Sequence, residues 1–290
     1  MQITKRRELM KVKIISDSTC DLSKELIEKF DIQIIPLYVK LGDKTLKDGV
    51  EVTPDDIYSY VEAKGELPTT SAPNLDDFTS VFGEWTSKGY AVVHINISGD
   101  FSSSYQNACV AACEVGNVYV VDSRNLSTGQ GLVVLHAAAL ARDGASPEAI
   151  KQSCDDLVSR VEASFVVDSI DYLYKGGRCS AVAALGANLL RLKPCIEVID
   201  GKMTSSKKYR GSIEKVIMNY VTDRLSNRDD IVFERIFITH TKIDPKTVKE
   251  VEKLIKKLCP QFENITETVA GCTVTSHCGP KTLGVLFIRK

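Results

Sequence analysis

The sequence lacks the short motifs that indicate the commonest enzyme chemistries. Its 290 residues contain no Cys-x-x-Cys pair, no two histidines at metal-binding spacing and no Gly-x-Ser-x-Gly nucleophile turn. The stretch HCGPKT is not a phosphate-binding loop, and Gly129-Gln130-Gly131 lacks the third glycine of a dinucleotide fingerprint, which Val134 replaces. On motifs alone, the case for an enzyme is poor.

The sequence also lacks an excess of charge and any long apolar run. Lysine and arginine number 37 against 38 acidic residues, so the formal net charge is −1 and no global field attracts nucleic acid. No basic tract with interleaved aromatic residues is present, and we expect no nucleic-acid partner. Because no stretch of 18 or more apolar residues and no secretory signal occur, we also expect no membrane span.

The nine cysteines are odd in number and scattered, which does not indicate a disulfide framework. Cys109 and Cys113 are four residues apart on an expected helix, a spacing that could hold a metal, but no further ligand completes such a site. We interpret them as buried small hydrophobic residues. A cytoplasmic protein without metal or cofactor fits this usage best.

The first half of the chain alternates strand-like and helix-like patterns. Apolar runs at residues 11–16, 91–98 and 118–123 alternate with helical patterns, which is typical of a parallel α/β domain. The near-continuous apolar run AVVHINIS (91–98) suits a central strand that is covered on both faces. Within these elements, His94 and His136 are expected to be core residues rather than catalysts.

The second half mixes hairpins with crossovers. Asp200-Gly201 is a turn between two strands, and CTVTSH and LGVLFIRK are expected to be terminal strands. We therefore predict two α/β domains, an N-terminal one at 11–160 and a C-terminal one at 161–290. Residues 1–10 are expected to form an N-terminal extension.

Hydroxyl side chains gather at four places along the chain. The stretch LPTTSAPN sets Thr69, Thr70 and Ser71 between two prolines, which is either a solvated turn or a rigid cluster of donors. Ser102-Ser103-Ser104 follows the central strand and precedes a helix, more hydroxyls than an N-cap requires. Asp122 to Ser127 and Thr275 to His277 are expected to end two further strands. Because ligands bind beyond the carboxyl ends of parallel strands, these neutral donors indicate a small anionic group such as a carboxylate.

Taken together, seven ordered blocks resemble the DegV family of bacterial fatty-acid-binding proteins over nearly the whole chain. The blocks are KIISDSTCDLS, LPTTSAPN, HINISGDFSSSYQNA, VVDSRNLSTGQG, YLYKGGRCS, LKPCIEVIDGKM and TSHCGPKTLG. The resemblance implies two α/β domains with a long-chain fatty acid buried between them. It also implies a non-catalytic, acyl-carrying subunit of a fatty acid kinase system, in which an ATP-binding kinase protein phosphorylates the bound carboxylate for phospholipid synthesis.

The resemblance also assigns residues. It implies that Thr70 with Ser71, Ser102 with Ser103, and His277 hold the fatty acid carboxylate. Arg178 and Arg210 resemble the basic residues with which the family docks its kinase.

Two positions depart from the family pattern, because Ser103 and Lys281 stand where glycine is usual. The loss of glycine at either position puts the head-group geometry in doubt.

Burial of an acyl chain requires a closed apolar tunnel, which residues 181–185 and 189–190 could line. Two alternatives to the carrier remain open at this stage. One is a hydrolase that uses Ser102 and His277 on a small carboxylate substrate. The other is a sensor whose bound lipid is a signal.

Overall fold

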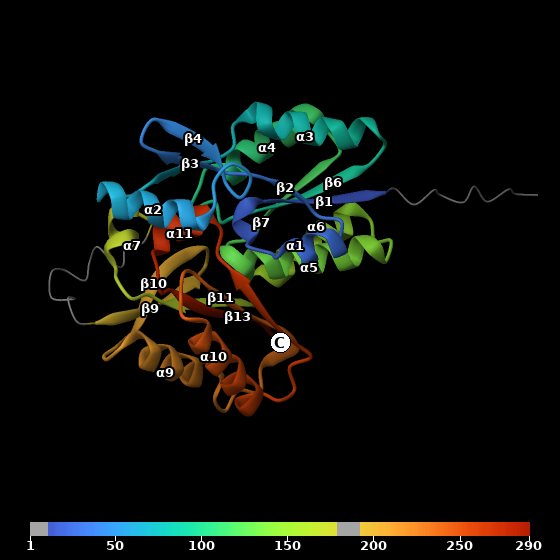
Figure 1. The fold of residues 1–290 in the computed structure, drawn as a ribbon. Helices are drawn as coiled ribbons and strands as arrows, with labels where there is room; N and C mark the ends of the chain where they lie inside the picture. The colour runs from blue at the N-terminus through green and yellow to red at the C-terminus, as the bar shows by residue number, and fades with distance from the viewer. Residues whose placement is uncertain (1–10, 179–191) are drawn as a thin grey trace, which may run out of the picture.

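The computed structural model describes residues 11–178 and 192–290, which form three β-sheets with helices between and around them (Figure 1). The first sheet is parallel throughout and has the strand order β2-β1-β6-β7. Its strands are β1 (Val12–Asp17), β2 (Gln33–Ile35), β6 (Ala91–Asn96) and β7 (Val118–Asp122). Every residue of β6 is buried, which confirms the predicted central strand.

Helices cover both faces of this sheet (Figure 1). On the outer face lie α3 (Leu75–Ser87) and α4 (Ser104–Val115), and on the other face lie α1 (Lys24–Lys29), α5 (Ser127–Arg142) and α6 (Pro147–Val158). His94 on β6 is buried with its ring 5.3 Å from those of Phe78 and Phe82, and burial lowers its pKa to about 3. Its prediction as a core residue is confirmed. His136 is half-buried, and its Nε2 lies 2.8 Å from the Ser153 hydroxyl.

The second sheet is mixed and has the strand order β10-β9-β8-β13-β11-β12. In chain order its strands are β8 (Val161–Val166), β9 (Lys193–Ile199), β10 (Lys202–Tyr209), β11 (Ile231–His240), β12 (Asn264–Val269) and β13 (Leu283–Arg289). The predicted hairpin is confirmed as β9–β10, whose turn residues Asp200 and Gly201 have φ of 50° and 82°. The sequence pattern did not indicate β12, which pairs in parallel with β11.

Helix α5 lies between the two large sheets, so they share one hydrophobic core. On the far face of the second sheet, α9 (Ile213–Leu225) and α10 (Pro245–Leu258) enclose another core (Figure 1). The predicted α/β fold class is confirmed. The division into 11–160 and 161–290 stays a prediction, which the start of the second sheet at Val161 supports.

A small third sheet carries one of the hydroxyl clusters. It has the antiparallel order β4-β3-β5, with β3 (Tyr38–Leu41), β4 (Lys44–Lys47) and β5 (Thr69–Ser71), and it lies beside α2 (Pro54–Lys64). IQIIPLYV reads as one strand in the sequence, but the chain is divided at Pro36 between β2 and β3. Thr70 therefore lies on a strand, paired with Val39, and not in a solvated turn.

The prediction of a terminal strand at CTVTSH is wrong, because these residues form the helix α11 (Cys272–Cys278). The amide groups of Gly271, Cys272 and Thr273 donate to side-chain oxygens of Asp21 and Asp48. These acceptors satisfy the free donors at the start of a helix, and they come from distant parts of the chain. Two short elements complete the fold near α11, the 3₁₀ helix η1 (Ser18–Cys20) and α7 (Asp171–Gly176).

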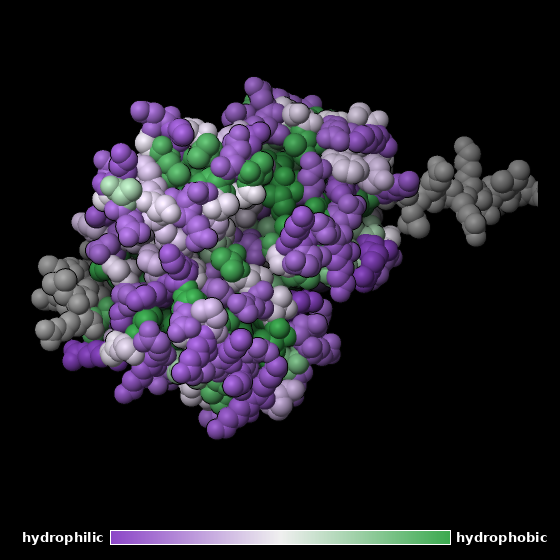
Figure 2. All heavy atoms as spheres, in the orientation of Figure 1, coloured by the Kyte–Doolittle hydropathy of each residue, from purple (hydrophilic) through white to green (hydrophobic). Residues whose placement is uncertain are grey.

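The face of the molecule seen in Figure 2 is mostly hydrophilic, with hydrophobic residues showing between polar side chains, chiefly in its upper half. Of the helices in the described part of the chain, none combines the length and the hydrophobicity that crossing a bilayer requires.

Candidate functional site

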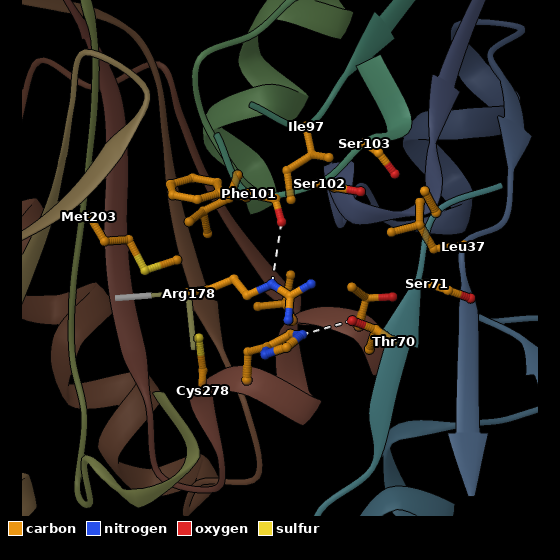
Figure 3. A pocket seen from close by; sticks show the side chains of 15 residues that line it. Leu37, Thr70, Ser71, Ile97, Phe101, Ser102, Ser103, Arg178, Met203 and Cys278 are labelled. Atoms are coloured by element: carbon orange, nitrogen blue, oxygen red, sulfur yellow. Dashed lines mark hydrogen bonds between the residues drawn. The ribbon is translucent and has the colours of Figure 1, made fainter. Parts of the chain in front are cut away.

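A cavity of about 280 Å³ gathers the residues that the sequence singled out. Its lining includes all five residues expected to hold a carboxylate, namely Thr70, Ser71, Ser102, Ser103 and His277. They come from β5, from the loop between β6 and α4, and from α11 (Figure 3). Arg178 also lines the cavity, whereas Arg210 does not.

Thr70 and His277 are joined directly across this cavity. The Thr70 Oγ1 lies 2.8 Å from the His277 Nε2 (Figure 3). Burial lowers the pKa of His277 to about 4, and the nearby positive charge of Arg178 acts in the same direction. The imidazole is therefore neutral at neutral pH. Its Nδ1 is buried, has no hydrogen-bond partner among the described residues, and lies against Gly176.

Ser102 and Ser103 lie at the start of α4. The Ser102 hydroxyl accepts a hydrogen bond from the Ser104 amide at 3.2 Å, whereas Ser103 is the N-cap residue and its side chain makes no capping bond. This loop is held in place by the buried Asp17 carboxylate, which accepts from the Ile97 amide at 2.9 Å. Ser102 and Ser103, next to the positive end of the α4 dipole, thus line the cavity.

Arg178 brings the only fully charged side chain among the described lining residues. Figure 3 shows it reaching into the middle of the lining, between Phe101 and Thr70. Its guanidinium donates to the carbonyl groups of Phe101 at 3.4 Å and Gly176 at 3.0 Å. Arg210, the other residue expected at a kinase interface, follows β10 and is exposed.

The cavity has an apolar part that sequence analysis did not assign. Buried side chains line it, those of Leu37, Ile97, Phe101, Leu126, Met203 and Cys278. Leu126, Cys278 and Val274 also line a second, smaller cavity of about 30 Å³ against the second sheet. The predicted tunnel lining at 181–185 and 189–190 lies outside the described residues.

Thr273 is a further residue that the sequence did not indicate. It lines the cavity one helical turn before His277, and its buried hydroxyl has no partner among the described residues. Residues four apart share a face in a strand as well as in a helix, so the spacing of Thr273 and His277 was an available signal under either structure.

One of the four hydroxyl clusters does not reach the site. Between Asp122 and Ser127, only Leu126 lines the cavity, while the Ser123 and Ser127 hydroxyls donate to the Asn125 carbonyl and to the Asp21 Oδ2.

The expectation that Cys109 and Cys113 are both buried is wrong, because Cys109 is half-buried and Cys113 is exposed.

The two departures from the family pattern have different outcomes. Ser103 has a φ of −71°, which any residue adopts, so this position does not need glycine. Lys281 has a φ of 60° and carries its exposed side chain in the left-handed conformation that favours glycine. Since Lys281 does not line the cavity, this backbone strain lies outside the site.

The site can hold an anionic group and an apolar tail together. Threonine and serine hydroxyls, a neutral imidazole and one guanidinium surround one part of the cavity, and aliphatic and aromatic side chains line the rest. Buried anions need such hydrogen-bond donors, because an unpaired buried charge is very unfavourable.

Comparison with known proteins points to the same kind of ligand. The DegV family model, described as "Uncharacterised protein, DegV family", matches residues 11–290. A DegV domain-containing protein of Clostridium acetobutylicum is 34% identical over 284 residues, which cover 97% of this chain and 99% of that protein. A fatty-acid-binding DegV family protein from Thermus thermophilus is similar in structure, with a TM-score of 0.85, 29% identity and coverage of 97% and 100%. A stearic acid-binding protein from Eubacterium ventriosum gives a TM-score of 0.81 at 29% identity, with coverage of 96% and 98%.

Proposed function

This chain belongs to the DegV family, and we propose that it binds a long-chain fatty acid with the carboxylate between Thr70, Ser102 and His277. The observation that carries the proposal is the Thr70–His277 pair, at 2.8 Å, in a cavity that is polar on one side and apolar on the other. Solved structures of similar fold are described as fatty-acid-binding proteins.

The polar groups match the needs of a carboxylate. The Thr70 and Ser102 hydroxyls can donate to the carboxylate without adding charge, and Ser71 and Ser103 lie beside them. The Nε2–H of the neutral His277 would donate to the Thr70 Oγ1, which leaves the Thr70 hydroxyl proton for the ligand. Arg178 supplies the single compensating positive charge. Hydrogen bonds to a charged group contribute about 1.5–3 kcal/mol each, so loss of one should be measurable.

The acyl chain would extend toward the apolar part of the cavity. Leu126, Val274 and Cys278 border both this cavity and the smaller one against the second sheet, which gives the tail a direction into the protein. A chain of about 15 methylenes gains about 12 kcal/mol on burial, against association costs of about 4–15 kcal/mol. Tight binding therefore depends on how completely the tail is enclosed.

We further propose that the protein acts without catalysis of its own and presents the carboxylate to an ATP-binding fatty acid kinase. The resulting acyl phosphate would feed phospholipid synthesis. The exposure of the lining residues supports this proposal. Ser71, Ser103 and Arg178 are exposed, whereas the apolar lining residues Leu37 and Leu126 are buried. The head group would thus lie at the accessible end, where a partner can reach it.

The observations do not favour the hydrolase alternative. A serine nucleophile needs a hydrogen bond to its base, but His277 bonds to Thr70, and the Ser102 hydroxyl accepts from the Ser104 amide. A lipid sensor would share the same cavity, and only an assay with the kinase separates it from a carrier.

We expect the purified protein to carry one long-chain fatty acid, which native mass spectrometry followed by solvent extraction would identify. The double variant Thr70→Ala, Ser102→Ala should lose this adduct, because the carboxylate then lacks two hydrogen bonds. Thr69→Ala is the matched control, since Thr69 is exposed on the same strand and does not line the cavity. A protein that is bare and also fails to bind added palmitate or oleate would contradict the proposal.

We expect Arg210→Ala to leave fatty acid affinity unchanged and to reduce acyl phosphate formation by the kinase about tenfold, the effect of losing about 1.4 kcal/mol of docking energy. The measurement is the rate of acyl phosphate formation against carrier concentration. Lys257→Ala, which removes an exposed cation near the end of α10, is the control. An unchanged rate for Arg210→Ala would remove Arg210 from the interface.

A further inference from the structure

Two buried aspartates hold the start of α11, the helix that carries His277. The Asp21 Oδ1 accepts from the Gly271 amide at 2.8 Å, and the Asp48 carboxylate accepts from the amides of Cys272 at 2.9 Å and Thr273 at 3.1 Å. Both aspartates are less than a tenth exposed. The orientation of α11 is therefore fixed by acceptors from the first part of the chain.

Asp48 also belongs to the part of the structure that carries Thr70. It directly follows β4, which pairs with β3, and the Val39 of β3 pairs with Thr70 of β5. Its amide donates to the Leu37 carbonyl at 2.9 Å, just before β3 begins. The residue thus connects the three-stranded sheet to α11.

A second set of hydrogen bonds, through Ser18, also connects Asp48 to the residue before β3. The Ser18 hydroxyl donates to the Asp48 Oδ2 at 3.1 Å and accepts from the Leu37 amide at 3.0 Å. Leu37 itself lines the cavity. Cys272 of α11 and Val39 of β3 also belong to one small hydrophobic cluster, together with Val52 and Ile57.

We propose that Asp48 is a positioning residue that sets the distance between Thr70 and His277. The inference rests on the proposed function, in which these two side chains hold the carboxylate. Asp48 touches neither of them. It acts by fixing the strand that bears Thr70 and the helix that bears His277 to one another, so that their 2.8 Å contact exists before a ligand arrives.

The test is Asp48→Asn, which keeps the size of the side chain and gives one acceptor oxygen where the carboxylate has two. One of the Cys272 and Thr273 amides then loses its acceptor. We expect the imidazole ¹⁵N signals of His277 to shift in the ligand-free protein, and the Kd for oleate to rise about tenfold.

Asp244→Asn is the matched control, because the Asp244 carboxylate also accepts from a first-turn amide, that of Lys246 at 2.9 Å at the start of α10, and Asp244 does not line the cavity. It should change neither readout. Should Asp48→Asn not fold, Ser18→Ala removes one of the three donors to Asp48 and should shift the His277 signals in the same direction.

Unchanged His277 signals in the folded variant would overturn the role of Asp48, whatever happens to stability. If the wild-type protein binds no oleate, the proposed function fails, but the His277 signals still decide whether Asp48 positions that side chain. The two failures are therefore distinguishable.

Discussion

Replacing Gly176 with alanine is expected to displace the His277 imidazole and to weaken fatty acid binding about 10- to 100-fold, because overpacking costs about 1–3 kcal/mol. A Cβ on Gly176 would lie 2.4 Å from the His277 Nδ1, closer than any real contact. Gly176 is the last residue of α7 and has no left-handed backbone, so alanine fits the helix and only the imidazole must move. Displacing it breaks the bond to Thr70.

A double-mutant cycle isolates this steric effect. In His277→Ala the obstructing ring is gone, so adding Gly176→Ala should cost no further affinity. Gly83→Ala is the control, because Gly83 lies within α3 and a Cβ there meets nothing within 4 Å. Kd values for oleate, with thermal unfolding as the check on folding, measure the cycle. Full additivity of the two changes would show that Gly176 does not act through His277.

Local signals in the sequence predicted most of the fold. Thr53 and Asn74 are helix N-caps in the structure, each with a capping box, because the side chains and amides of two residues three positions apart are enough to form one. The buried strand β6 was also predicted, because a near-continuous apolar run is typical of a strand that is covered on both faces. These features depend on neighbours in sequence.

Helix α11 could not be predicted in this way. Its residues are rich in threonine and valine, which favour strands, and its first amides are satisfied by Asp21 and Asp48. The acceptors come from the opposite end of the chain, so no window of sequence around α11 contains them. Tertiary hydrogen bonds override local propensity here.

The candidate site was predictable as a set of residues but not as an arrangement. The hydroxyl clusters and the family resemblance named Thr70, Ser102 and His277, which the structure places around one cavity. Neither could show that His277 bonds to Thr70, or that Arg178 enters the cavity lining. Those relations depend on how the third sheet, α7 and α11 pack together.

The buried Asp21 makes stability depend on pH in an unusual direction. Burial raises the pKa of Asp21 to about 8, and the charges of Asp48 and Asp17 act in the same direction. An unfolded aspartate has a pKa of about 3.9. Between these two values the folded state holds a proton that the unfolded state has released. The contribution of Asp21 to the free energy of unfolding is therefore largest at low pH. It falls by at most about 1.4 kcal/mol per pH unit as the pH rises, and it levels off above the folded pKa.

Asp21→Asn should remove this dependence and should be more stable than the wild-type protein at pH 9. Asparagine carries no charge, tolerates the φ of 49° at this position, and keeps an oxygen for the Gly271 amide. The measurement is urea unfolding of both proteins from pH 6 to pH 9, expressed as the difference in unfolding free energy. Asp200→Asn is the control, since Asp200 has a similar φ of 50° but is exposed and forms its ion pair with the exposed Arg124, so its difference curve should be flat. A flat curve for Asp21→Asn as well would mean that Asp21 is already ionised in the folded protein. Its bonds to Ser127 and Gly271 would then stabilise the carboxylate more than burial destabilises it.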